Sequence, residues 1–101
     1  MPKIYKYLGI IFKFWSDDHE PIHLHAFYGA KQVKILIYIV NNKIVKIEYK
    51  TVKGYEKIPP AKMADVKEFV EKYEKQIVDA YIRIFILKMK WKCVVIKRRI
   101  K

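Results

Sequence analysis

Every histidine of this chain lies between positions 19 and 25, as His19, His23 and His25. Three carboxylates belong to the same short segment, namely Asp17, Asp18 and Glu20. Imidazole is the side chain whose charge changes nearest to neutral pH, and it is the commonest nitrogen ligand of metals. Acid–base chemistry or metal binding is therefore indicated more strongly here than in any other part of the sequence.

One interpretation of this segment is catalysis without a metal. A histidine with a pKa near 6.5 accepts or gives a proton at neutral pH, and a neighbouring carboxylate can orient it. Nearby cations that stabilise developing charge on a phosphate would complete a set suited to RNA cleavage. The candidate catalytic residues are His19, His23, His25, Asp18 and Glu20.

Two other interpretations stay open. On a strand, His23 and His25 would point to the same face, about 6.6 to 7 Å apart, with His19 folding back beside them as a third metal ligand. However, all candidate ligands come from one segment and the single cysteine, Cys93, is distant. We therefore expect metal binding to be weak or absent, and no cofactor. In the structural interpretation, the histidines fix a loop or form part of a binding surface.

Strands are expected on both sides of this segment. Residues 3–15 are rich in aromatic and β-branched side chains and break at Gly9, which predicts two short strands or one bent strand. Pro21 and the preceding Ser-Asp-Asp favour a loop around the first histidine. Further strands are predicted over 22–28, 32–40 and 43–50, and Asn41-Asn42 is expected to form a tight turn between the last two.

A long helix is expected to begin at Pro60, where the missing N–H of proline costs nothing. Apolar residues then recur at helical spacing: Val66, Phe69, Val70, Tyr73, Ile77, Ala80, Tyr81, Ile84 and Leu87. After Leu87, lysines alternate with Met89, Trp91 and Cys93, which predicts an edge strand near 91–98 with Trp91 against the body of the protein. The predicted fold is a single α+β domain over 1–101. It has an antiparallel four- to five-stranded sheet and one long helix packed on one face.

Positive charge is concentrated at the end of the chain. The formal net charge is +12, and residues 80–101 contain eight lysines or arginines and no acidic residue. A segment whose charged side chains are all positive favours a polyanion or an acidic protein as partner, although it can also be a solubilising tail. The candidate nucleic-acid-binding residues are Lys88, Lys90, Lys92, Lys97, Arg98 and Arg99.

The location of the protein is expected to be cytoplasmic. A single cysteine excludes an internal disulfide framework. The first residues lack the continuous apolar run of a signal peptide. No stretch approaches the roughly 18 apolar residues of a membrane span, so no membrane association is expected.

The start of the chain carries a family pattern: Met1-Pro2-x-Ile4, an aromatic stretch ending in Phe14-Trp15, and then Asp18-His19-Glu20-Pro21-Ile22-His23-Leu24-His25. This pattern resembles a small prokaryotic family, domain of unknown function 4160, whose hallmark is D/E-H-x-P-P-H-x-H. The hallmark is matched at Asp18, His19, Pro21, His23 and His25, while Ile22 replaces its second proline. The resemblance covers most of residues 1–87 in the order and type of elements.

Members of that family often lie beside a second small protein, an arrangement similar to a toxin–antitoxin pair. The resemblance therefore implies a toxin-like component of a two-gene module, with a small acidic protein encoded by the adjacent gene as its partner. Combined with the histidine segment, it suggests action on RNA. The alternative is a non-enzymatic basic binding or regulatory module, antitoxin-like or nucleic-acid-binding, whose histidines are structural. A metal-dependent hydrolase is the third hypothesis.

Overall fold

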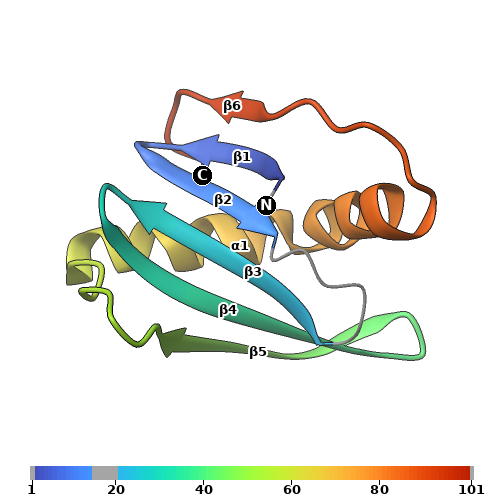
Figure 1. Ribbon diagram of the computed structural model, residues 1–101, viewed down its shortest axis with the longest axis horizontal. Helices are drawn as coiled ribbons and strands as arrows, with labels where there is room; N and C mark the ends of the chain where they lie inside the picture. Colours follow the sequence, from blue (N-terminus) through green and yellow to red (C-terminus); the bar gives the residue numbers. More distant parts are fainter. Residues whose placement is uncertain (1, 15–20, 101) are drawn as a thin grey trace.

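The computed structural model describes residues 2–14 and 21–100. These residues form a six-stranded sheet with one long helix behind it (Figure 1), and the strands are arranged in the order β5-β4-β3-β2-β1-β6. In chain order the elements are β1 (Lys3–Tyr7), β2 (Ile10–Phe14), β3 (Ile22–Tyr28), β4 (Lys31–Val40), β5 (Lys43–Thr51), α1 (Pro60–Tyr81) and β6 (Val94–Ile96). The predicted combination of one long helix with a sheet is confirmed.

Tight turns join the strands in pairs. Leu8 and Gly9 connect β1 to β2 with φ angles of 49° and 81°, and Asn41 and Asn42 connect β4 to β5 with φ angles of 52° and 64°. Two consecutive residues with positive φ form the turn whose twist matches that of a β-hairpin, and asparagine and glycine tolerate this conformation best. The predicted turn at Asn41-Asn42 is confirmed, and of the two alternatives for residues 3–15 the structure shows two short strands that meet at Leu8-Gly9. Both turns fix the register in which the strands pair.

The two faces of the sheet differ in composition. Side chains that point toward α1 are apolar and have no exposed surface, as in Leu24 and Ala26 of β3, Phe12 of β2 and Ile35 of β4. Because side chains alternate along a strand, the residues between them point the other way. No helix of the described residues lies on that second side (Figure 1), which we call the helix-free face.

Phe69 is the centre of the packing between α1 and the sheet. Its ring stacks on Phe12 with a centroid distance of 4.5 Å and on Tyr73 with a distance of 4.7 Å. The rings of Tyr5 and Tyr7 both lie 5.3 Å away. The first two strands and the helix therefore share one aromatic cluster, which fixes the helix against β1 and β2.

The helix ends differently from the prediction. After Tyr81 the chain forms a π-helical turn, Ile82–Ile86, in which the Leu87 N–H donates to the carbonyl oxygen of Ile82 at 2.9 Å. A bond that spans five residues rotates the following side chains off an apolar stripe spaced for an α-helix. Leu87 is consequently 59% exposed, and its predicted place in the helix–sheet interface is wrong.

The C-terminal segment returns along the free edge of β1. There β6 pairs with β1 in parallel, Tyr5 facing Val94 and Tyr7 facing Ile96. The expectation of a purely antiparallel sheet of four to five strands is therefore wrong, because a sixth strand joins in the direction of β1. This edge strand is also shorter than the predicted range of 91–98.

The side-chain pattern predicted for the C-terminal segment is partly right. Trp91 and Cys93 are half-buried, and the Trp91 indole N–H donates to the carbonyl oxygen of Ile4 at 3.0 Å, whereas Met89 is exposed.

No helix in residues 2–14 and 21–100 is long and apolar enough to cross a membrane.

Candidate functional site

The central strand β3 carries His23 and His25 on the helix-free face. Ile22, Leu24 and Ala26 alternate with them and are fully buried on the other side. The prediction that these two histidines share one face is therefore confirmed. The other candidate catalytic residues, His19, Asp18 and Glu20, lie outside the described residues, as does Asp17, and their approach to the pair stays a prediction.

His25 is held in one orientation. It is 5% exposed, and its ring nitrogen Nδ1 is hydrogen-bonded to the side-chain oxygen Oε1 of Gln32 on β4. An amide oxygen only accepts, so Nδ1 carries the proton and Nε2 is the acceptor of the neutral ring. Burial lowers the pKa of His25 from 6.5, the Gln32 bond partly opposes this, and electrostatic interactions with Lys34 and His23 lower the pKa further. His25 is therefore neutral at neutral pH.

A row of basic side chains crosses the sheet at the level of His25. In the strand register Lys3 faces Lys13, Lys13 faces His25, His25 faces Lys34, and Lys34 faces Lys50. Residues that face one another on neighbouring strands point to the same side of a sheet. We call these five residues the lysine row; they extend over strands β1 to β5 of the helix-free face.

The lysine row is electrostatically unfavourable in the free protein. Like charges directly opposite each other on neighbouring strands destabilise a sheet, and this happens at Lys3–Lys13 and again at Lys34–Lys50. The one acidic side chain that strands β1 to β5 place on this face is Glu48, which pairs with Lys46 and interacts electrostatically with a single member of the row, Lys50. A bound polyanion would relieve the repulsion between the lysines, which makes the row a candidate binding site.

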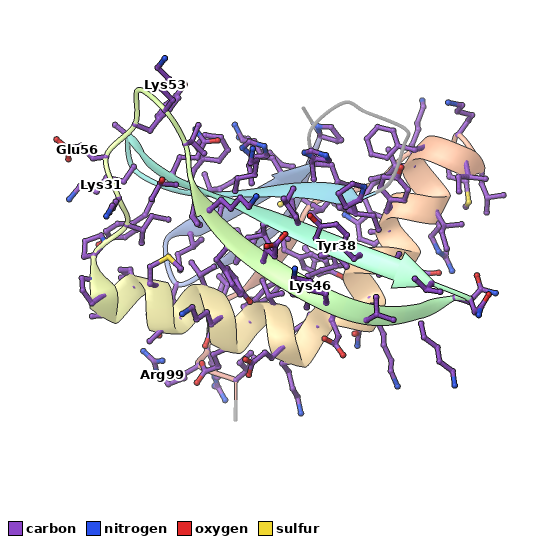
Figure 2. The ribbon with its side chains drawn as sticks, turned by 90° about the horizontal axis from the view of Figure 1, so that it is seen from below. Lys31, Tyr38, Lys46, Lys53, Glu56 and Arg99 are labelled. Carbon is purple, nitrogen blue, oxygen red and sulfur yellow. The ribbon has the colours of Figure 1, made fainter. Side chains whose placement is uncertain are left out.

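Glu48 belongs to a small group beside the row. It accepts a hydrogen bond of 2.7 Å from the Tyr38 hydroxyl and forms an ion pair of 3.5 Å with Lys46. Figure 2 shows Tyr38 and Lys46 close together on β4 and β5, with the lysine amine 5.6 Å from the centre of the tyrosine ring. The hydrogen bond from Tyr38 lowers the pKa of Glu48, so this carboxylate stays ionised.

Aromatic rings lie next to the basic side chains of this face. Phe27 on β3 stacks with His25 at a centroid distance of 6.3 Å, and the amine of Lys13 lies 4.8 Å from the centre of the Phe27 ring. Together with Tyr38 they give the helix-free face both cations and ring surfaces. Basic surfaces with interleaved aromatic rings are typical of proteins that hold unpaired nucleotides.

The predicted nucleic-acid-binding residues of the C-terminal segment divide into two groups. Arg99 is bound within the protein, by Asp65 at 2.7 Å and by Glu68 at 3.6 Å. Figure 2 shows it beside α1, on the side away from the sheet. The remaining members are exposed: Lys88, Lys90, Lys92, Lys97 and Arg98.

The lysine row was missed from the sequence although its signal is present there. Lys3, Lys13 and Lys34 each sit next to a buried apolar neighbour in a strand, as Lys13 does between Phe12 and Phe14, and Lys50 follows the half-buried Tyr49. Alternation thus gives the face of each lysine, but the pairing of strands decides that they form one row.

Among residues 2–14 and 21–100, no group of three or more histidine, cysteine or acidic side chains is placed to hold a metal ion. The remaining candidate ligands, His19, Asp17, Asp18 and Glu20, lie outside this part of the chain. The expectation of weak or absent metal binding therefore stays a prediction.

The comparison with protein families matches the central part of the chain. A family model described as "Domain of unknown function (DUF4160)" matches residues 9–81, from the turn between β1 and β2 to the end of α1. The match includes His23 and His25 and four members of the lysine row, and it leaves out β1 and β6. No curated protein and no solved structure matches the chain. Since the family model spans well over half of the sequence, the resemblance seen in the histidine motif is confirmed, and the chain belongs to the DUF4160 family.

Proposed function

We propose that this protein binds single-stranded nucleic acid, RNA in particular, on the helix-free face of its sheet. The observation that carries the proposal is the lysine row: four lysines and His25 aligned across five strands, with repulsive pairs that a phosphate backbone would neutralise.

The shape of the surface favours a single strand over a duplex. Neighbouring strands are about 4.8 Å apart, so the lysine row spans roughly 19 Å. The major groove of DNA is about 12 Å wide and admits a helix or a two-stranded ribbon, but not a five-stranded face. An unpaired strand can lie across such a face, with its phosphates on the lysines and its bases on Phe27 and Tyr38, where stacking contributes about 1–3 kcal/mol per base.

Fluorescence anisotropy with labelled oligonucleotides of one sequence tests this proposal. We expect single-stranded RNA to bind more tightly than the matching duplex, and binding to weaken steeply as salt is raised. A parallel titration with single-stranded DNA measures any dependence on the 2′-hydroxyl. Equal affinity for duplex and single strand would contradict the proposal, because a flat face gives the duplex no comparable contact.

RNA cleavage is the second candidate function, in line with a toxin-like component of a two-gene module. The observation that favours it is the state of His25: neutral, oriented by Gln32 and flanked in its row by Lys13 and Lys34. In this hypothesis the neutral imidazole of His25 accepts the proton of a 2′-hydroxyl, while the lysines stabilise charge on the phosphate.

Expression in a bacterial host tests the cleavage hypothesis. Growth arrest that disappears with His23→Ala or His25→Ala would support it, and RNA that is bound but never cut by the purified protein would count against it. Loss of cleavage on adding a chelator would instead indicate the metal-dependent hydrolase. Co-expression with the product of the adjacent gene tests the expected acidic partner, which should co-purify and relieve the arrest.

A further inference from the structure

A small pocket lies where the end of β5 meets the first turns of α1. Its volume is about 230 Å³, below the 300–1,000 Å³ of sites that enclose a drug-sized ligand. The apolar part of its wall includes Ile58 and Met63, and the polar part includes Tyr49, Thr51, Lys57 and Lys67. A pocket of this size and composition suits a small polar group rather than a whole cofactor.

The charge of this pocket sets it apart from other hollows of the described surface. It is lined by three lysines and by no carboxylate. Three other hollows each contain glutamate: one has Glu68 and Glu71, another has Glu56, and the third has Glu74. A pocket with several cations and no counter-charge in its wall favours a small anion.

Tyr49 provides a second, independent observation. Its hydroxyl is buried and has no hydrogen-bond partner among the described residues, although its ring lies 5.5 Å from the amine of Lys67. Buried hydroxyls are nearly always hydrogen-bonded, and no described protein group uses this one, so it is available to a group bound in the neighbouring pocket. Burial, Glu71 and Glu74 raise the pKa of Tyr49 to about 12. The hydroxyl therefore remains protonated and able to donate.

The pocket adjoins the site described above. Lys50 and Gln32 line the pocket from the ends of β5 and β4, while their side chains belong to the helix-free face, where Lys50 ends the lysine row and Gln32 orients His25. A strand that follows the row toward β5 would reach the pocket with its end. Terminal phosphates differ from internal ones by an additional negative charge, and that charge is what Lys57 and Lys67 would recognise.

We propose that the pocket between β5 and α1 binds a phosphate monoester, supplied by the phosphorylated end of a nucleic-acid strand lying on the lysine row. This inference rests on the proposed function for the source of the phosphate. The pocket itself would also accept free inorganic phosphate, so the two parts can be tested separately.

The test compares three RNA oligonucleotides of one sequence, with a 5′-phosphate, with a 3′-phosphate or with hydroxyls at both ends. We expect one of the phosphorylated forms to bind about tenfold more tightly than the unphosphorylated form, as for hydrogen bonds to a charged group. Tyr49→Phe and Lys57→Gln should remove this preference while leaving the affinity for the unphosphorylated RNA unchanged.

Lys53→Gln is the matched control. Lys53 lies at the tip of the loop after β5, away from α1 (Figure 2), and does not line the pocket, yet its substitution removes the same charge. It should keep the preference for the phosphorylated end. Tyr49→Phe retains the ring and removes an unsatisfied buried hydroxyl, so its thermal unfolding temperature should be unchanged or higher than that of the wild type.

The outcomes distinguish a failure of the pocket proposal from a failure of the proposed RNA binding. Equal binding of all three oligonucleotides would overturn the pocket proposal and leave RNA binding standing. If no oligonucleotide binds but inorganic phosphate raises the unfolding temperature of the wild type and not of Lys57→Gln, the pocket is supported and the proposed function fails. A preference that survives both Tyr49→Phe and Lys57→Gln would place the phosphate elsewhere and overturn the pocket.

Discussion

The two faces of the sheet are built from alternate residues of the same strands, yet they have opposite effects on the stability of the protein. On the side of α1, Leu24, Phe12 and Ile35 are fully buried and belong to one hydrophobic core with Phe69. On the helix-free face, lysines face lysines across neighbouring strands. The first arrangement lowers the free energy of the folded state through burial, whereas the second raises it through repulsion.

This difference shows where function can be sought. A sequence selected for stability alone would place opposite charges beside each other, as the protein does at Lys46 and Glu48 of β5. Arrangements that destabilise the folded protein are expected at functional sites, because binding of a ligand offsets their cost in free energy. The lysine row is such an arrangement. The following substitutions test whether the helix side of the sheet stabilises the protein while the helix-free face binds the ligand.

The largest expected effect is on the helix side. Phe69→Ala should reduce the free energy of unfolding by about 3–5 kcal/mol, because a fully buried ring at the centre of the aromatic cluster is lost. Phe27→Ala, on the helix-free face, is the matched control and should cost clearly less, since Phe27 is only half-buried. Urea denaturation measures both. Equal losses would remove the distinction between the two faces.

Trp91→Ala tests whether the Trp91 side chain holds the C-terminal segment, including β6, against the body of the protein. The Trp91 ring lies 6.0 Å from that of Tyr5 and its indole N–H bonds to Ile4, so the substitution should cost about 2–3 kcal/mol. It should also speed hydrogen exchange in β6. Met89→Ala, two residues earlier and exposed, should change stability by less than about 0.5 kcal/mol. Unaltered exchange in β6 after Trp91→Ala would show that the indole does not hold this segment.

The pH dependence of stability should contain a contribution from His25. Its folded-state pKa is below 6.5, so on acidification the unfolded chain takes up a proton before the folded protein does. Stability is therefore complete above pH 6.5 and falls as the pH drops from 6.5 toward the folded-state pKa. Urea midpoints measured across this window should fall less in His25→Gln. A wild-type midpoint that rises on acidification would contradict the burial of a neutral His25.

The smallest effect is expected in the lysine row itself, with a sign opposite to that of most substitutions. Lys34→Gln removes a charge that faces Lys50, so the free energy of unfolding should increase by about 0.2–1 kcal/mol. Lys46→Gln, on the same face, removes the partner of Glu48 and should not stabilise the protein. High-precision thermal unfolding at low salt distinguishes the two, and a loss of stability in Lys34→Gln would argue against repulsion in the row.

Much of the fold could be predicted from local patterns. Alternation marked the first five strands, Gly9 and Asn41-Asn42 marked the turns, and Pro60 marked the start of the helix. The sixth strand was predicted at the edge, but its length and parallel direction depend on the return of the chain along β1. The end of the helix was misjudged because a π-helical turn leaves the apolar spacing of the sequence unchanged while rotating the side chains.

The candidate site was predicted less completely. The shared face of His23 and His25 follows from their spacing on a strand, and the structure confirms it. Gln32 as the partner of His25 comes from the pairing of β3 with β4, which no local pattern reveals. The basic C-terminal segment drew attention because its charges are consecutive, while the lysines of the row are scattered over almost fifty positions and meet only in the folded sheet.

The central claim is that the lysine row, rather than the C-terminal segment, contacts the nucleic-acid backbone. The most direct measurement is the salt dependence of RNA binding for two variants that each lose two positive charges, Lys34→Gln with Lys50→Gln and Lys90→Gln with Lys92→Gln. Each phosphate contact with a single strand contributes about 0.7 to the slope of log affinity against log salt. We expect the row variant to lower this slope by about 1.4 and the C-terminal variant to leave it nearly unchanged. The reverse result would contradict the account and assign binding to the C-terminal segment.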